Sequence, residues 1–171
     1  LFLFIKTADC YSLYFQLYKK FQKVIRSEKK LKELAGILKR GNSLFISRAI
    51  KSLRGEEPFE GAIGLLTAFY DSTESKILKK AIEDFFNDIK DQSARPEVIA
   101  EIRNKWKGST ISMLVASCWQ SGIQYSDYLD DFAKVFLKGD YATSIECMTV
   151  IEEAAQICNR DTKDEVIRLI N

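Results

Sequence analysis

The 171-residue sequence contains no histidine, and this absence excludes several classes of active site. Without an imidazole, the chain cannot build a Cys–His or Ser–His dyad from its own residues. Zinc sites that use histidine and di-iron sites built on an ExxH motif are excluded for the same reason. Neither a Walker A loop nor a GxGxxG loop occurs. We therefore expect a protein with no cofactor, no metal site and no enzymatic activity.

Residues that interrupt helices are scarce, with only 2 Pro and 8 Gly in the chain. Both counts are low against usual usage, so helices are favoured over strands. No apolar run approaches the roughly 18 residues that span a bilayer. The chain begins with Leu rather than Met, so we expect a fragment or a processed form and leave an upstream signal open. Four scattered cysteines without a CxxC pair predict reduced thiols in a cytoplasmic protein; they are Cys10, Cys118, Cys147 and Cys158.

Charge is unevenly distributed along the chain, although the formal net charge is only +2. Residues 1–55 carry 13 Lys and Arg against 3 Asp and Glu, a net charge of +10. Residues 56–171 carry 13 and 21, a net charge of −8. Such an asymmetry can mark a partner-binding end or attract two copies of one chain to each other. Solvated helix faces would produce the same distribution.

Helical periodicity extends along almost the whole chain and predicts about ten helices. A basic, aromatic-rich helix is expected over roughly 11–27, followed by a second helix that ends at Gly41. Asn42 or Ser43 can cap the third helix, and Pro58 is well placed at the start of the fourth.

In the second half of the chain, two pairs have the spacing of a capping box: Asp71 with Glu74, and Thr162 with Glu165. The first pair would open the fifth helix, and the second pair would open the last one. The remaining helices are expected over about 96–107, 110–121, 126–138 and 140–158.

The apolar positions of these helices repeat at an offset of 32 residues. The pattern of Ile46, Ala49, Ile50 and Leu53 recurs as Leu78, Ala81, Ile82 and Phe85. At the same offset, Leu34, Ile37 and Leu38 match Leu66, Phe69 and Tyr70. A looser third copy is expected at Leu129, Phe132, Ala133 and Phe136. The helix of 96–107 would then be an insertion between the second and third units.

The unit length and the I-x-x-A-I-x-x-L helix resemble HEAT-like repeats, in the armadillo-like α-solenoid class, over about residues 29–158. The resemblance implies an all-α fold, namely a short α-solenoid of stacked antiparallel helical hairpins, because one hairpin cannot bury its apolar face alone. Residues 1–28 are expected to form an amphipathic capping helix, and residues 29–171 the repeat domain. The alternatives are a non-repetitive bundle and, for the first helix, a role at a membrane surface.

This architecture predicts a non-catalytic scaffold that binds another protein or a second copy of itself. The candidate interaction surface has a basic group and an acidic group: Arg48, Lys51, Lys79, Lys80, Asp130 and Asp131. The alternative function is nucleic-acid binding by the basic N-terminal half, since some HEAT-like solenoids bind DNA along a basic face. The position held by Arg48 in the first predicted unit is held by Lys80 in the second and by Asp131 in the third. The charge at this position therefore changes sign in the third unit.

The stretch VASCWQSG, residues 115–122, contains Ser117-Cys118-Trp119, which resembles the sequence around the nucleophile of papain-like cysteine proteases. In that family the cysteine opens a helix and has a histidine partner. Here no histidine exists, and Gly122 places Cys118 near the end of a helix instead. We therefore expect Cys118 and Trp119 to be packing residues, with a thiol that is unreactive in the native state.

Overall fold

The structure is a computed structural model that describes residues 27–40, 42–54, 59–158 and 160–170. Within these residues the fold is all-α, without strands, as predicted. After the helical residues 27–39, the α-helices are α2 (Ser43–Leu53), α3 (Ala62–Ser72), α4 (Lys76–Asn87), α5 (Arg95–Ile102), α6 (Gly108–Gln120), α7 (Leu129–Lys138), α8 (Tyr141–Ala155) and α9 (Arg160–Ile170). Short 3-10 helices, η1 (Gln92–Ala94) and η2 (Ser126–Tyr128), precede α5 and α7. None of the helices described is long and apolar enough to cross a membrane.

Two predictions concern residues outside this part of the chain. The basic first helix and most of the capping segment 1–28 lie outside the described residues, as does Pro58. Asn42 is described, and its side chain accepts hydrogen bonds from the backbone N–H groups of Leu44 and Phe45. The predicted cap of the third helix is therefore confirmed.

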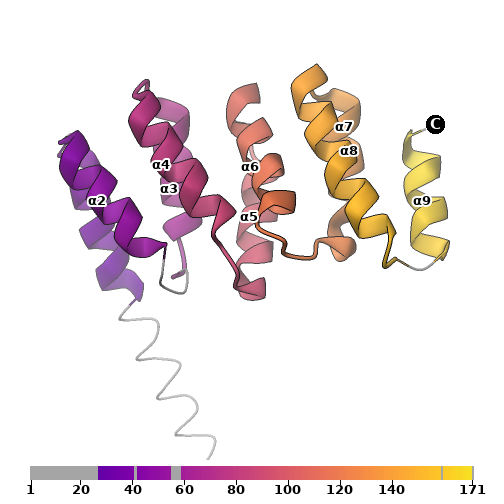
Figure 1. Cartoon of the computed structure of the whole chain (residues 1–171), viewed down its shortest axis with the longest axis horizontal. Helices are drawn as coiled ribbons and strands as arrows, with labels where there is room; N and C mark the ends of the chain where they lie inside the picture. The colour runs from indigo at the N-terminus through magenta and orange to yellow at the C-terminus, as the bar shows by residue number, and fades with distance from the viewer. Residues whose placement is uncertain (1–26, 41, 55–58, 159, 171) are drawn as a thin grey trace, which may run out of the picture.

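The helices lie in two rows (Figure 1). The front row contains α2, α4, α6 and α8, and each of these helices contacts the next one. Helical residues 27–39, α3, α5 and α7 lie behind them, with α3 in contact with α5 and α7 in contact with α9. We call 27–39 with α2 the first pair, α3 with α4 the second, α5 with α6 the third, and α7 with α8 the fourth.

The front-row helices repeat with a constant period, because they begin at residues 43, 76, 108 and 141 and successive starts lie 32 or 33 residues apart. Their buried side chains follow the same register. Equivalent buried positions are held by Ile46, Leu78, Thr110 and Thr143, and by Ile50, Ile82, Leu114 and Cys147. The back row shows the same offset of 32 in Leu34, Leu66 and Val98, and in Leu38, Tyr70 and Ile102. The predicted register is therefore present in the core.

The predicted position of the third copy is wrong. Leu129 and Phe132 are buried as expected, but they belong to α7, which lies in the back row rather than in the row of α2 and α4. The helix that follows α4 in the front row is α6. Accordingly, the helix starting near Pro96 is not an insertion, because α5 is the first helix of the third pair.

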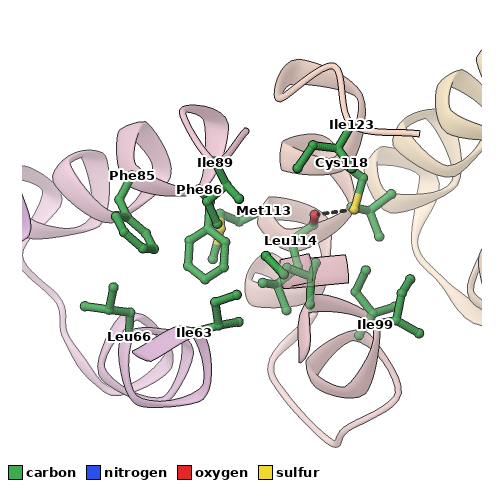
Figure 2. Close-up of a cluster of buried hydrophobic side chains, with 14 of the residues drawn as sticks. Ile63, Leu66, Phe85, Phe86, Ile89, Ile99, Met113, Leu114, Cys118 and Ile123 are labelled. Atoms are coloured by element: carbon green, nitrogen blue, oxygen red, sulfur yellow. Dashed lines mark hydrogen bonds between the residues drawn. The ribbon is translucent and has the colours of Figure 1, made fainter. Parts of the chain in front are cut away.

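The resemblance at Cys118 has a structural explanation. Cys118 lies in the last turn of α6, is only 1% exposed, and occupies the core position equivalent to Phe86 in α4. Its thiol donates to the backbone oxygen of Leu114, at 3.3 Å, among the buried side chains between the second and third pairs (Figure 2). Burial raises the pKa of this thiol far above its usual value. The expected packing role is confirmed in the structure.

Both predicted capping boxes are wrong, and one of their carboxylates caps a different helix. Asp71 lies inside α3, and its carboxylate accepts from the backbone N–H of Lys107, at 2.9 Å, and from the hydroxyl of Thr110, at 2.7 Å. It therefore caps α6 of the next pair. Thr162 and Glu165 both lie within α9 rather than ahead of it.

Glu97 of α5 makes the reverse connection, because its Oε1 accepts from the backbone N–H groups of Gly61 and Gly64 at the start of α3. Gly61 is suited to this turn, since its φ of +85° lies in the left-handed region. Adjacent pairs are thus joined by carboxylates placed at helix N-termini, where backbone N–H groups lack partners within their own helix.

Candidate functional site

One edge of the molecule collects exposed apolar side chains. This tip edge is the edge at which each pair turns from its back-row to its front-row helix, uppermost in Figure 1. Large apolar residues are exposed there at the starts of α2, α4 and α8 and at the end of α7. They are Leu44, Phe45, Ile77, Leu137, Tyr141 and Ile145. The other exposed large apolar residues of the described chain, Ile157, Ile167 and Leu169, lie towards its C-terminal end.

A cleft of about 490 Å³ opens at the tip edge between the third and fourth pairs. We call it the tip cleft. Its walls come from the turn between α5 and α6 and from the turn between α7 and α8. Apolar surface is supplied by four lining residues, of which Ile102 is buried and the others are half-buried: Ile102, Trp106, Ile111 and Val135.

Cationic side chains also line the tip cleft. The Arg103 guanidinium donates from two nitrogens to the two carboxylate oxygens of Asp131, both at 2.7 Å. The Arg103 side chain is 59% exposed, whereas that of Asp131 is only 6% exposed. Lys134 pairs with Asp130 at 2.7 Å. The exposed Lys138 completes the cationic lining.

The turn that carries Trp106 has the sequence Arg-Asn-Lys-Trp-Lys, residues 103–107, and is a basic segment within the acidic part of the chain. The Trp106 indole N–H donates to Glu101 at 3.1 Å, which fixes the ring against α5. Lys107 is anchored by a hydrogen bond from its ammonium group to the backbone oxygen of Asp71, at 2.6 Å. The turn is therefore held at both sides of the tryptophan.

The two carboxylates that line the tip cleft are engaged with protein donors. Both oxygens of Asp131 accept from Arg103. Asp140 is the N-cap of α8 and accepts from the backbone N–H of Thr143 at 2.8 Å. This backbone hydrogen bond, together with one from the Thr143 side chain, lowers the pKa of Asp140. Lys138 and Asp140 are both exposed residues of the cleft lining.

The predicted basic group lies on α2 and α4 and is not brought to the tip cleft. Arg48 and Lys51 are exposed on α2. Lys80 is exposed on α4 and pairs with Asp84 at 3.1 Å. Lys79 was expected to be exposed, but it is half-buried, with its ammonium group 5.2 Å from the centre of the Tyr70 ring.

The predicted acidic group is divided by the structure. Asp130 is partly exposed and pairs with Lys134. Asp131 was expected on the surface, but it is buried beneath Arg103, because adjacent residues of a helix point in different directions and Asp131 faces the third pair. Asp131 therefore joins the third and fourth pairs and cannot serve as a free acidic contact.

Apart from Asp131, the residues that line the tip cleft were not identified from the sequence. Trp106, Arg103 and Lys138 come from two turns that are about 30 residues apart, so no local pattern connects them. The one available signal was the run of basic residues around Trp106, which is unusual in a half of the chain with a net charge of −8.

A second, smaller recess of about 290 Å³ lies between α4 and α6. Its lining is largely polar and includes Tyr70, Glu83 and Ser112. The Tyr70 hydroxyl donates to Glu83 at 3.0 Å. The pKa of Tyr70 is raised above its usual value, mainly by burial and also by this hydrogen bond. This recess lacks the apolar floor of the tip cleft.

Comparisons with protein-family models, with curated proteins and with solved structures found no match to this chain.

Proposed function

We propose that this protein is a non-catalytic helical-repeat scaffold, a short HEAT-like α-solenoid that binds another protein. The two rows of helices and the constant period of the front row support the repeat architecture. The polar bonds between pairs support it as well, because they join adjacent pairs: Arg54 with Asp88, Asp71 with Thr110, and Arg103 with Asp131. A stack in which each unit contacts only its neighbours is the defining property of a solenoid.

The observation that carries the binding function is the apolar tip edge. Phe45 is 62% exposed, Ile77 is 72% exposed and Tyr141 is 83% exposed. Single exposed apolar residues need no explanation, but several along one edge are typical of a protein interface. Tyrosine and phenylalanine are enriched at such interfaces because they bury a large area with few rotatable bonds.

The test is affinity capture from a native lysate with the wild-type chain and with the variant Phe45→Glu/Ile77→Glu. A charge at both positions opposes burial against a partner, so we expect a stoichiometric partner to be lost. The control is Ile167→Glu, at an exposed apolar position of α9 outside the tip edge. Capture that is unchanged by the double variant, or no stable partner at all, would contradict the proposal.

Nucleic-acid binding is the alternative proposal, and the front-row register weakens it. The positions equivalent to Arg48 are Lys80, Ser112 and Ile145, so the cations of this row end after the second pair. A phosphate backbone needs cations along its whole path. A mobility shift with duplex DNA or RNA that weakens steeply with salt would favour this alternative over a protein partner.

A further inference from the structure

We propose that the tip cleft binds an acidic segment of a partner protein, with one bulky apolar side chain of that segment inserted between the third and fourth pairs. This inference rests on the proposed scaffold function and adds the chemistry of the partner. It depends on three features of the tip cleft: its volume, its apolar floor and the exposure of its cations.

The volume and floor fit a side chain of a peptide. A cleft of about 490 Å³ lies within the range of small-ligand sites. The floor combines the ring of Trp106 with the aliphatic side chains of Ile111 and Val135. Because the indole N–H of Trp106 is already bonded to Glu101, the ring presents apolar surface and needs no polar partner from the ligand.

The charges favour an acidic ligand. Three cationic side chains line the cleft with two carboxylates, of which Asp131 is buried against Arg103 and Asp140 is exposed and accepts from the backbone N–H of Thr143. In the pair between Arg103 and Asp131 the guanidinium is exposed and the carboxylate is buried. Lys138 forms no ion pair with any described residue and stands at the rim next to Leu137. A ligand carboxylate can therefore reach Arg103 and Lys138 without displacing a carboxylate of the protein.

The surroundings favour a short peptide over a nucleic acid. Asp130 is partly exposed on α7, Asp127 is exposed in the preceding η2, and residues 56–171 have a net charge of −8. A phosphate backbone that leaves the cleft along α7 would meet these carboxylates. A short acidic segment can place its charges on the cationic rim alone, with its apolar residue on Trp106.

The experiment uses the full chain with Trp119→Phe, so that Trp106 is the only tryptophan and its emission reports on the cleft. The probe is the acetylated and amidated hexapeptide of sequence EELFEE, titrated at low salt. We expect saturable change of the Trp106 emission, and binding weakened several-fold by 0.5 M NaCl, because screening shortens the reach of the rim charges. The peptides KKLFKK and EEGGEE are matched controls for charge and for the apolar insert, and both should bind at least tenfold more weakly.

The variant Lys138→Glu tests the rim, since Lys138 forms no ion pair with a described residue and its reversal should leave the fold intact. We expect at least a fivefold loss of EELFEE affinity, whereas Lys51→Glu on α2 should leave it unchanged. Equal binding to wild type and Lys138→Glu, binding of KKLFKK as tight as that of EELFEE, or no saturation would each overturn the inference. Displacement of EELFEE at low salt by a 20-nucleotide DNA, lost steeply as the salt concentration rises, would also overturn it, in favour of a nucleic-acid ligand.

Failure of the inference can be separated from failure of the scaffold proposal. If a lysate partner is lost on Phe45→Glu/Ile77→Glu but retained by Lys138→Glu, the tip edge is an interface and the tip cleft is not its acidic-peptide site. If the partner is retained by both variants, the scaffold proposal itself fails.

Discussion

The second and third pairs place their front-row side chains at equivalent core positions but fill them differently. In α4 these positions hold large apolar side chains, namely Leu78, Ile82, Phe85 and Phe86. In α6 the positions 32 residues later hold Thr110, Leu114, Ser117 and Cys118. The same helical register can therefore be built on bulky side chains or on small, weakly polar ones.

The small polar residues are tolerated because each hydroxyl has an acceptor: Asp71 of α3 accepts from Thr110, and carbonyl oxygens of α6 accept from the serines. The Ser117 hydroxyl donates to the Leu114 carbonyl oxygen at 2.7 Å, and the Ser121 hydroxyl donates to that of Cys118 at 3.0 Å. A buried hydroxyl without such an acceptor would cost about 1–3 kcal/mol. Among the described residues, no buried side-chain nitrogen or oxygen lacks a hydrogen bond. The core of α6 therefore combines small residues whose polar groups are hydrogen-bonded with the buried apolar side chains of Met113, Leu114 and Val115.

The sharpest test of this comparison is truncation at one register position in both helices. Phe86→Ala should lower the free energy of unfolding by about 3–5 kcal/mol, because it removes a buried ring and leaves a cavity. Cys118→Ala removes only a sulfur atom and should cost about 1 kcal/mol. Urea denaturation of both variants measures the difference. Similar losses of unfolding free energy at the two positions would contradict this difference in how the two helices fill the core.

The ion pairs of the two regions can be compared in the same way. Asp131 is buried beneath Arg103, whereas Asp88 pairs with Arg54 at the surface, with the Asp88 side chain 40% exposed. Asp131→Asn should cost about 2 kcal/mol, since it removes a carboxylate that accepts two charged hydrogen bonds. Asp88→Asn should cost less than about 1 kcal/mol, because a surface pair is solvated and screened. Thermal unfolding of both variants measures the two losses of stability. Equal losses would contradict the distinction between a buried and a surface ion pair.

Asp71 of the second pair caps α6 of the third pair, and its contribution to the free energy of unfolding should depend on pH. The backbone N–H of Lys107, and then the Thr110 hydroxyl, hold the pKa of Asp71 below its usual value. The ionised form is therefore favoured in the folded state, and its stabilisation is present above about pH 4 and lost as the pH falls through the lowered pKa. Asp71→Ala should cost about 1 kcal/mol at pH 7.

At pH 2 the difference in unfolding free energy between Asp71→Ala and wild type should be smaller than at pH 7, because protonation of Asp71 removes the charged acceptor. Guanidinium denaturation at the two pH values measures it. A gap that widens in acid would be inconsistent with a charged cap.

The last prediction concerns the rates at which the cysteine thiols are labelled, and it involves no expected change in stability. Cys118 and Cys147 are buried, and burial raises the pKa of the Cys147 thiol to about 12. Cys158 is half-buried at the C-terminal end of the array. In a Cys10→Ser background, native-state labelling should modify Cys158 first, and the two buried thiols should react only on unfolding. Fast modification of Cys118 would contradict its assignment as a buried packing residue.

The prediction from sequence succeeded where large apolar residues recur and failed where they do not. The stripe of Ile46 and Ile50 and its repeat at Leu78 and Ile82 were identified because both carry aliphatic side chains. The next copy was assigned to Leu129 and its neighbours because they resemble that stripe, whereas the true continuation in α6 carries Thr110 at the equivalent position. Hydrophobic periodicity locates helices well, but it does not show to which row a helix belongs.

The tip cleft and the division of the acidic group illustrate the same distinction. Helix content, the cap at Asn42 and the 32-residue register follow from local side-chain chemistry and from spacing along the chain. The burial of Asp131, the capping of α6 by Asp71 and the approach of Lys138 to Trp106 depend on the packing of one pair against the next. These contacts join residues about 30 to 40 positions apart, and only the tertiary fold decides them, because a helix can satisfy its own backbone but not its ends or its outward-facing charges.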